Sequence, residues 1–445
     1  MRNNHVSEVN ISPRIHAGKV DIGPEYALPL YGYGERQVSA SVIRESLEAN
    51  WVHVEDLTAK PWLLLAIDTL FSSATFETAL RRHLIARGVE VAELIVVASH
   101  THFAPALDDT KPALGVADLA YIEDVAGLVA ADVSQGVQFS QDLAPEYWTY
   151  ANKNISGAVF RRAKRLTLSM RSRPNIRIST QIAPNPSIKI DQDLRVWIAR
   201  NLENVPLFAL VTWPCHATSR SNPGRISPDF VGVLRDGIRA EFRLSIPVLY
   251  FPGASGDVRP NFSGLGKGKR LFYPYPFQIG FERPDETTVT AFDATLSQAA
   301  QHCANQAKTR LPFDGCIVVK TEIPHTEFMQ GADESQMRIA MARLGGIDIF
   351  GFGAEISALW PNLLGLDNER ERCLVTGCVG HCFGYLPEDS QIPNGGYEVL
   401  GFRESFRVTG NYSLNQSIYS ALKSSIDYLL DSRGVVLQPS QGLVS

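Results

Sequence analysis

The sequence lacks an apolar segment long enough to cross a bilayer, and it lacks a basic cluster. Its formal net charge is -5 at pH 7, which argues against a nucleic-acid-binding surface. Residues 1–8 are polar where a secretory signal peptide needs an apolar core. These absences predict a cytoplasmic protein with no nucleic-acid partner and no stable membrane insertion.

Cysteine is scarce, with six residues in a chain of 445, which is too few for a disulfide framework and fits a reducing compartment. Cys373, Cys378, His381 and Cys382 form a Cys-x4-Cys-x2-His-Cys pattern that superficially invites a structural zinc site. The spacing lacks paired Cys-x2-Cys clips. Buried thiols are therefore the preferred interpretation.

The glycines and lysines of residues 264–270 do not form a phosphate-binding loop, because the glycine spacing is short and no Ser or Thr follows the lysines. Residues 263–283, rich in Gly, Lys and aromatics, are expected to form a long loop near a cleft. The apolar fraction of 44% and the charged fraction of 20% are those of a soluble globular protein. In the absence of a repeat or a convincing linker, we expect one large domain over residues 14–432, with flexible tails at 1–13 and 433–445.

Apolar runs and helical patterns alternate along the chain, which predicts an α/β (mixed α+β) fold with a central mixed sheet covered by helices. Strands are expected at 14–22, 61–68, 93–98, 194–199, 207–213, 248–251, 314–322 and 347–352, with 194–199 and 207–213 joined as a hairpin. Helices are expected at 74–87, 118–133, 229–242, 287–308, 333–344 and 412–430.

Polar groups follow several of these strands at Gly- or Pro-marked ends: His100 and His102, His216, Asp257, and Glu355. Strand ends of one sheet collect in one crevice, so these groups are expected to converge. Two histidines from different strands with one carboxylate are the ligand types of a hydrolytic zinc site. Each residue also has a plainer interpretation, since a lone His216 is often a satisfied core residue and Glu355 suits the start of a helix.

The motifs around these residues resemble those of the neutral/alkaline ceramidases, zinc-dependent amidases that remove the fatty acyl group from ceramide. Residues 99–105, Ser-His-Thr-His-Phe-Ala-Pro, are similar to the family's Thr-His-Thr-His-Ser-Gly-Pro. Residues 209–219 are similar to its strand ending in Val-His-Pro-Thr-Ser, residues 256–261 to its Gly-Asp-Val-Ser-Pro-Asn, and residues 16–22 to its start. Order and approximate spacing agree from residue 14 to about residue 430.

The resemblance implies one zinc ion per chain and a ceramidase N-terminal-domain-like fold. Its metal ligands would be His100, His216, Glu355 and Tyr385. Tyr385 is chosen because it stands twelve residues before Tyr397, a spacing that the family keeps between its zinc-bound tyrosine and a second active-site tyrosine.

The resemblance also implies amide hydrolysis by zinc-activated water, without an obligatory covalent intermediate. His102 would carry a proton to the leaving amine. Tyr397 and Arg161 would donate hydrogen bonds to the developing oxyanion, with Arg162 nearly as good a match as Arg161.

Two departures from the family pattern bear on the substrate. Arg259 replaces the family's serine, and a guanidinium is no nucleophile at neutral pH but binds carboxylate or phosphate well. With Asp257 and Asn261, it is expected to bind a polar or anionic small molecule, unless Arg259 turns outward. The chain stops near Ser445, where full ceramidases continue into a C-terminal β-sandwich domain.

The leading hypothesis is hydrolysis of the N-acyl bond of a soluble metabolite. Two alternatives remain: an ester or lactone hydrolase or cyclase in a biosynthetic pathway, and a non-catalytic paralogue that binds a ligand. A homo-oligomer is compatible with the sequence.

Overall fold

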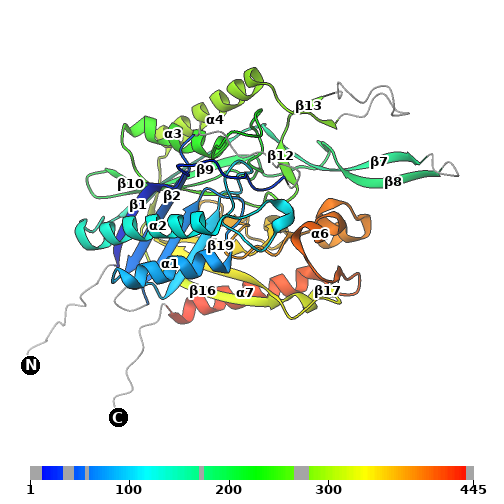
Figure 1. The fold of residues 1–445 in the computed structure, drawn as a ribbon. Helices are drawn as coiled ribbons and strands as arrows, with labels where there is room; N and C mark the ends of the chain where they lie inside the picture. Colours follow the sequence, from blue (N-terminus) through cyan, green and yellow to red (C-terminus); the bar gives the residue numbers. More distant parts are fainter. Residues whose placement is uncertain (1–12, 34–44, 56–59, 170–174, 265–279, 437–445) are drawn as a thin grey trace, which may run out of the picture.

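The computed structural model describes residues 13–33, 45–55, 60–169, 175–264 and 280–436, and has three larger sheets (Figure 1). The first sheet runs in the order β1-β2-β3-β4, antiparallel except for the parallel pair β3–β4. Its strands are β1 (Arg14–Asp21), β2 (Glu48–Glu55), β3 (Trp62–Ile67) and β4 (Glu93–Ala98). Every residue of β3 is buried, as expected for an apolar run in the interior of a sheet.

The second sheet has the order β11-β10-β9-β5-β15. Its strands are β5 (Tyr147–Asn154), β9 (Asp193–Arg200), β10 (Pro206–Thr212), β11 (Val248–Phe251) and β15 (Thr309–Pro312). The predicted hairpin is confirmed, because β9 and β10 are antiparallel. Strands β10 and β11 are parallel and are connected through helix α3 (Phe230–Phe242).

The third sheet, β16-β18-β19-β21, corrects one prediction. Its strands are β16 (Cys316–Pro324), β18 (Gln336–Leu344), β19 (Ile347–Phe352) and β21 (Cys373–Thr376). The helix expected at 333–344 is wrong, since β18 is the central partner of β16 and β19. Both faces of β18 are covered: Met337, Ile339 and Met341 enter one core cluster, and the alternate residues Ala340, Ala342 and Leu344 enter another. Pairing and two-sided burial thus override the helix propensity of Ala, Met and Arg.

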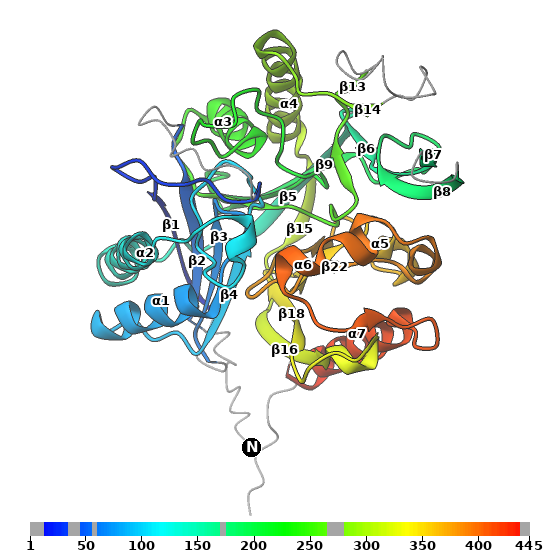
Figure 2. The same ribbon diagram turned by 45° about the vertical axis from the view of Figure 1, so that its right-hand side comes forward.

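The long helices cover the outer faces of the sheets (Figures 1 and 2). Helices α1 (Ala74–Ala86) and α2 (Leu119–Phe139) pack side by side against the first sheet, α3 and α4 (Glu286–Gln306) against the second, and α7 (Ile418–Val436) along β16. In α2, Ile122, Val125, Val129 and Val133 are buried at helical spacing, and the Asp118 side chain caps the N-terminus. Among the described residues, no helix is both long and apolar enough to span a membrane.

Short two-stranded ladders connect the sheets around the predicted site. They include β6 (Ala158–Phe160) with β12 (Val258–Pro260), β20 (Glu355–Ile356) with β22 (Tyr385–Leu386), and β17 (Met329–Gln330) with β23 (Asn411–Tyr412). The β7 (Arg162–Ser169) and β8 (Asn175–Ile182) hairpin extends away from the sheets (Figure 1). Of the loop expected at 263–283, the ends pair as β13 (Ser263–Gly264) and β14 (Gly280–Phe281), and residues 265–279 lie outside the described part of the chain. Helices α5 (Trp360–Leu363) and α6 (Arg403–Phe406) are single turns.

One apolar cluster joins the three sheets. It contains Val52 and Leu64 from the first sheet, Trp197 and Leu210 from the second, and Ile349 from the third, all at most 2% exposed. Because burial of such side chains stabilises the fold by roughly 1.5–3 kcal/mol each, this shared core fixes the relative position of the strands that end at the site.

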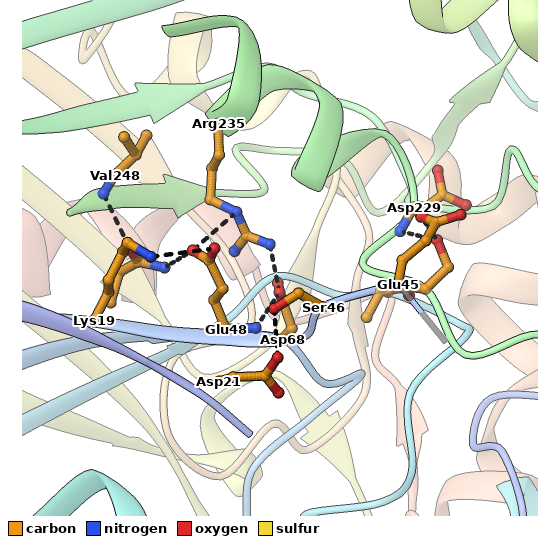
Figure 3. A network of polar contacts seen from close by, with 12 residues as sticks. Lys19, Asp21, Glu45, Ser46, Glu48, Asp68, Asp229, Arg235 and Val248 are labelled. Carbon is orange, nitrogen blue, oxygen red and sulfur yellow. Dashed lines mark hydrogen bonds and ion pairs between the residues drawn. The ribbon is translucent and has the colours of Figure 1, made fainter. Parts of the chain in front are cut away.

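A buried polar network ties the first sheet to α3 and β11 (Figure 3). Glu48 on β2 accepts two hydrogen bonds from Arg239, at 2.8 and 2.7 Å, and lies 3.6 Å from Arg235. Arg235 also donates to Asp68, just after β3, at 2.6 Å. This network holds the end of β3 beside α3, which matters for the site because the segment after Asp68 contacts His100.

Replacing Glu48 by Gln is expected to destabilise the protein. Burial alone would raise the pKa of Glu48, but Arg235 and Arg239 outweigh burial and lower the pKa from 4.5 to about 2. This depression corresponds to about 3 kcal/mol at neutral pH. Because the folded-state pKa is the lower one, the contribution is present above about pH 4.5 and is lost as the pH falls toward 2. Urea unfolding should therefore show a Glu48→Gln deficit that shrinks between pH 6 and pH 3.

Glu55→Gln provides the matched control at the other end of β2. Glu55 pairs with Arg14, whose side chain is 55% exposed, and such pairs contribute about 0–1 kcal/mol. Equal losses in the two variants would contradict the assigned role of the Glu48 network.

Candidate active site

Four of the predicted site residues, His100, His102, His216 and Glu355, lie together although they come from different sheets. His100 and His102 follow β4 in the first sheet, His216 follows β10 in the second, and Glu355 lies in β20 after β19 of the third. The expectation that one sheet brings them together is therefore wrong. The site forms where the three sheets meet, and Glu355 lies in a strand and not at a helix start.

Backbone hydrogen bonds connect the segments that carry these residues to one another. The end of β4 pairs with the segment after β21 through Ala98 N–H to Cys378 O at 3.0 Å. His102 N–H donates to Ala217 O at 3.2 Å, and Gly256 N–H donates to Ile356 O at 2.8 Å. A Cβ at Gly256 would come within 2.7 Å of Glu355 O, so only glycine permits this close approach.

Three imidazoles meet in the site. The potential ligand atoms of His100, His102 and His216 all lie within 4.8 Å of one another, and the ring centroids of His100 and His216 are 4.6 Å apart. His102 is thus close enough to share a metal ion with the other two histidines. The geometry leaves two roles for His102, a third nitrogen ligand or the proton carrier expected from the sequence.

The ring orientations of His100 and His216 are set by backbone carbonyls. His100 Nδ1 lies 3.2 Å from Leu70 O, and His216 Nδ1 lies 2.7 Å from Ser255 O. These contacts favour a proton on each Nδ1, which leaves the Nε2 lone pairs facing Glu355 Oε2 at 3.2 and 3.0 Å. A carbonyl behind a ligating histidine is the usual arrangement in metal sites.

The protonation states of these buried groups leave lone pairs facing one another. Burial, and then the charge of Arg161, lower the pKa of His216 to about 3. Burial alone would raise the pKa of Glu355, but His100 and His216 lower it below its usual range. At neutral pH His216 is therefore an uncharged imidazole and Glu355 a carboxylate. His100 Nε2 and Glu355 Oε2 have no hydrogen-bond partner among the described residues.

These residues fit a zinc ion. Imidazole nitrogens and a carboxylate oxygen are zinc ligand types, and a cation between His100 Nε2, His216 Nε2 and Glu355 Oε2 would have all three as ligands. One contact competes with this role, because Arg161 Nη1 lies 3.0 Å from His216 Nε2. The lone pair of His216 can bind a metal only when Arg161 releases it.

Arg161 enters the site just after β6, and its backbone N–H donates to Asp257 O at 2.7 Å. Its side chain donates to Glu398 through Nε at 2.8 Å, and Nη2 is buried with no hydrogen-bond partner among the described residues. Arg162 donates to the other oxygen of Glu398 at 2.6 Å. The carboxylate of Glu398 thus anchors both arginines, with only Arg161 reaching His216.

Tyr385 and Tyr397 lie beside this group. Tyr385 on β22 is the parallel partner of Glu355 on β20, and its ring lies 5.4 Å from the Arg161 guanidinium. The ring centroids of Tyr385 and Tyr397 are 5.5 Å apart. Burial, and then the charge of Glu355, raise the pKa of Tyr385 above its usual range and that of Tyr397 to about 12. Tyr397 is therefore a protonated phenol at neutral pH and can donate a hydrogen bond.

The remaining predicted residues lie around this centre. Asp257 is fully buried, and its carboxylate accepts hydrogen bonds from Ser357, Ala358 and Gln391. Through these contacts, Asp257 positions the segments that contain residues 357–358 and Gln391. Asn261 is exposed and lines a separate surface pocket of about 700 Å³, so the structure does not bring it to the histidines.

The sequence interpretation missed Glu398, which stands 237 residues from Arg161 and next to the recognised Tyr397. Its only sequence signal is a carboxylate beside that tyrosine. The six cysteines are all free and buried, as expected for buried thiols.

No protein-family model matches the sequence, and no curated protein is similar to it. The structure is similar to that of neutral ceramidase from Pseudomonas aeruginosa, with a TM-score of 0.67 over 95% of this chain and 75% of that chain, at 15% identity. A ceramidase complexed with C2 matches with the same TM-score and the same coverage at 14% identity. This protein therefore has a ceramidase-like fold.

Proposed function

We propose that the protein is a zinc-dependent hydrolase of an N-acyl (amide) bond in a polar or anionic small molecule. The observation that carries the proposal is the buried set of His100, His216 and Glu355, in which His100 Nε2 and Glu355 Oε2 face each other with no hydrogen-bond partner among the described residues. The ceramidase-like fold supports the reaction type. Tyr385, the partner of Glu355 in the β20–β22 ladder, would be the fourth ligand.

When bound, zinc supplies Lewis acidity toward a carbonyl group and activates water near neutral pH. Arg161 keeps one buried nitrogen free to donate to the oxygen that gains negative charge, and Glu398 holds the guanidinium in place. Tyr397 is the second donor. Each such donor commonly lowers the barrier by about 3–4 kcal/mol.

His102 would protonate the leaving amine. Its ring lies 5.2 Å from that of His100 and packs at 4.8 Å against Tyr33. Expulsion of an amine needs a proton on nitrogen, and a positioned imidazole commonly contributes about 10²–10⁴-fold to such a step.

Metal analysis of the purified protein is expected to give about one zinc ion per chain. The His100→Ala/His216→Ala double variant should lose it, because the two imidazole donors are removed. The exposed His302→Ala variant, on α4, is the control and should keep its zinc. Unchanged zinc in the double variant would refute the site.

A panel of matched N-acyl and O-acyl compounds with the zinc-loaded protein tests the bond type. Turnover of amides supports the proposal. Turnover of esters or lactones alone would favour the alternative reaction, and tight binding without any turnover would favour the ligand-binding paralogue.

A further inference from the structure

Arg259 carries a charge that no described carboxylate balances. It is half-buried on β12, its Nε atom is buried without a hydrogen-bond partner, and its guanidinium lies 4.4 Å from the ring centroid of Phe281. Most of the buried arginines, in contrast, pair with a carboxylate: Arg161, Arg162, Arg195, Arg220 and Arg235. Arg200, which has none, donates instead to Thr149 and Asn204. The described part of the chain therefore supplies no anion for the guanidinium of Arg259, although its Nε atom is removed from solvent.

The strand register shows which way Arg259 points. In the β6–β12 ladder Arg259 is the partner of Val159, and partners in a ladder project to the same face. Arg161 stands two residues after Val159 and continues the pairing through its hydrogen bond to Asp257 O, so it shares that face. Arg259 therefore projects to the same side as Arg161 and does not turn away from the site.

Two residues of the site, Tyr33 and Arg161, influence the charge of Arg259. Burial lowers the pKa of Arg259, the phenol of Tyr33 opposes this, and the charge of Arg161 lowers the pKa further, so both residues are near enough to act on its charge. The ring of Tyr33 packs at 4.8 Å against His102. Tyr33 thus packs against the residue assigned to the leaving amine, and Arg161, which shares the face of Arg259, lies 3.0 Å from His216.

We propose that Arg259 binds a carboxylate on the amine half of the substrate, so that the substrate class is N-acyl amino acids. This inference rests on the proposed function for the amide hydrolysis. It adds that the negative charge of the substrate lies on the amine side of the bond that breaks. A guanidinium binds a carboxylate through two parallel hydrogen bonds, which a serine at this position cannot do. In the reaction the amide C–N bond breaks, the oxygen of water bonds to the acyl carbon, and the nitrogen gains a proton. The products are a carboxylic acid and a free amino acid.

The test compares an N-acylglycine with the N-acylglycinamide of the same acyl chain, which differs only in the carboxylate. The zinc-loaded wild-type protein should prefer the acid by about a hundredfold in kcat/KM, because only the acid can form a charged hydrogen-bonded pair with Arg259. Arg259→Gln should remove most of this preference, chiefly through KM for the acid, and change the amide less than about threefold. Arg259→Lys should restore part of the preference.

Arg310→Gln is the matched control, because Arg310 also lies over an aromatic ring, at 4.5 Å from Tyr147, but is exposed on β15. It should leave the preference unchanged.

Where the protein hydrolyses neither compound, equilibrium binding of the same pair gives the comparison. A lost preference in Arg259→Gln then supports the carboxylate site while the hydrolase proposal fails. Equal preference of wild-type protein for acid and amide, or equal loss of both in Arg259→Gln, overturns the inference.

Discussion

The Glu355→Gln variant is expected to purify without zinc and to unfold at a higher temperature than the metal-free wild-type protein. In the metal-free protein, Glu355 Oε2 lies 3.2 Å from His100 Nε2 and 3.0 Å from His216 Nε2, with lone pairs facing lone pairs. A glutamine has nearly the same shape, and its NH₂ group can donate to His100 Nε2, whereas Arg161 already lies 3.0 Å from His216 Nε2. It removes a buried charge and supplies a donor, a gain of about 1–3 kcal/mol for the metal-free state.

The same substitution should lower amide hydrolysis by about a thousandfold or more, because Lewis-acid stabilisation amounts to several kcal/mol. Zinc content by metal analysis and thermal unfolding with and without a chelator are the two measurements. The chelator should lower the melting temperature of the wild-type protein and leave that of the variant unchanged.

Glu398→Gln is the matched control, since it is the same change at another buried glutamate. The partners of Glu398 are donors, Arg161 at 2.8 Å and Arg162 at 2.6 Å, so its replacement should destabilise the protein and leave zinc in place. Stabilisation by Glu355→Gln together with destabilisation by Glu398→Gln would show that the carboxylate of Glu355, unlike that of Glu398, needs a bound cation. A Glu355→Gln variant that keeps one zinc ion per chain, or that is less stable than the metal-free wild-type protein, would contradict the assignment.

Much of the site could be predicted because it lies at the ends of strands with clear local patterns. The apolar run before His100 and the hairpin of β9 and β10 are buried strands whose period is visible in the sequence. The helix predicted at 118–133 exists and runs to Phe139, since its apolar residues repeat at helical spacing. Such segments carry their own signal, so the residues that follow them could be placed in outline.

The parts that could not be predicted depend on contacts between distant segments. Within the described part of the chain, the side chain of Glu398 accepts hydrogen bonds from Arg161 and Arg162, which are more than 230 residues away in the sequence. Similarly, β18 has the composition of a helix and becomes a strand because two sheet partners and two core clusters surround it. The meeting of three sheets at one site has no local signature, which is why a single sheet was expected.

Replacing His102 by Ala is expected to lower kcat for amides by about 10²–10⁴-fold while zinc content stays unchanged. The reason is its position: His102 is near enough to share a metal with His100 and His216, but its ring also packs at 4.8 Å against Tyr33. If His102 were a third nitrogen ligand, the variant would lose zinc together with activity. Metal analysis of the variant therefore separates the two roles.

The leaving group gives a second, independent test of the same residue. A nitrophenyl ester of the same acyl chain expels a stable anion that needs no proton, so His102→Ala should slow its hydrolysis less than about tenfold. Loss of a metal ligand would instead slow the ester and the amide alike, since both need the Lewis acid. Loss of Arg161 as an oxyanion donor would also affect both, because both reactions place negative charge on the same oxygen. A defect confined to amides is thus specific to proton delivery, and it would assign to the second histidine of the His-x-His pair a task that the first does not perform.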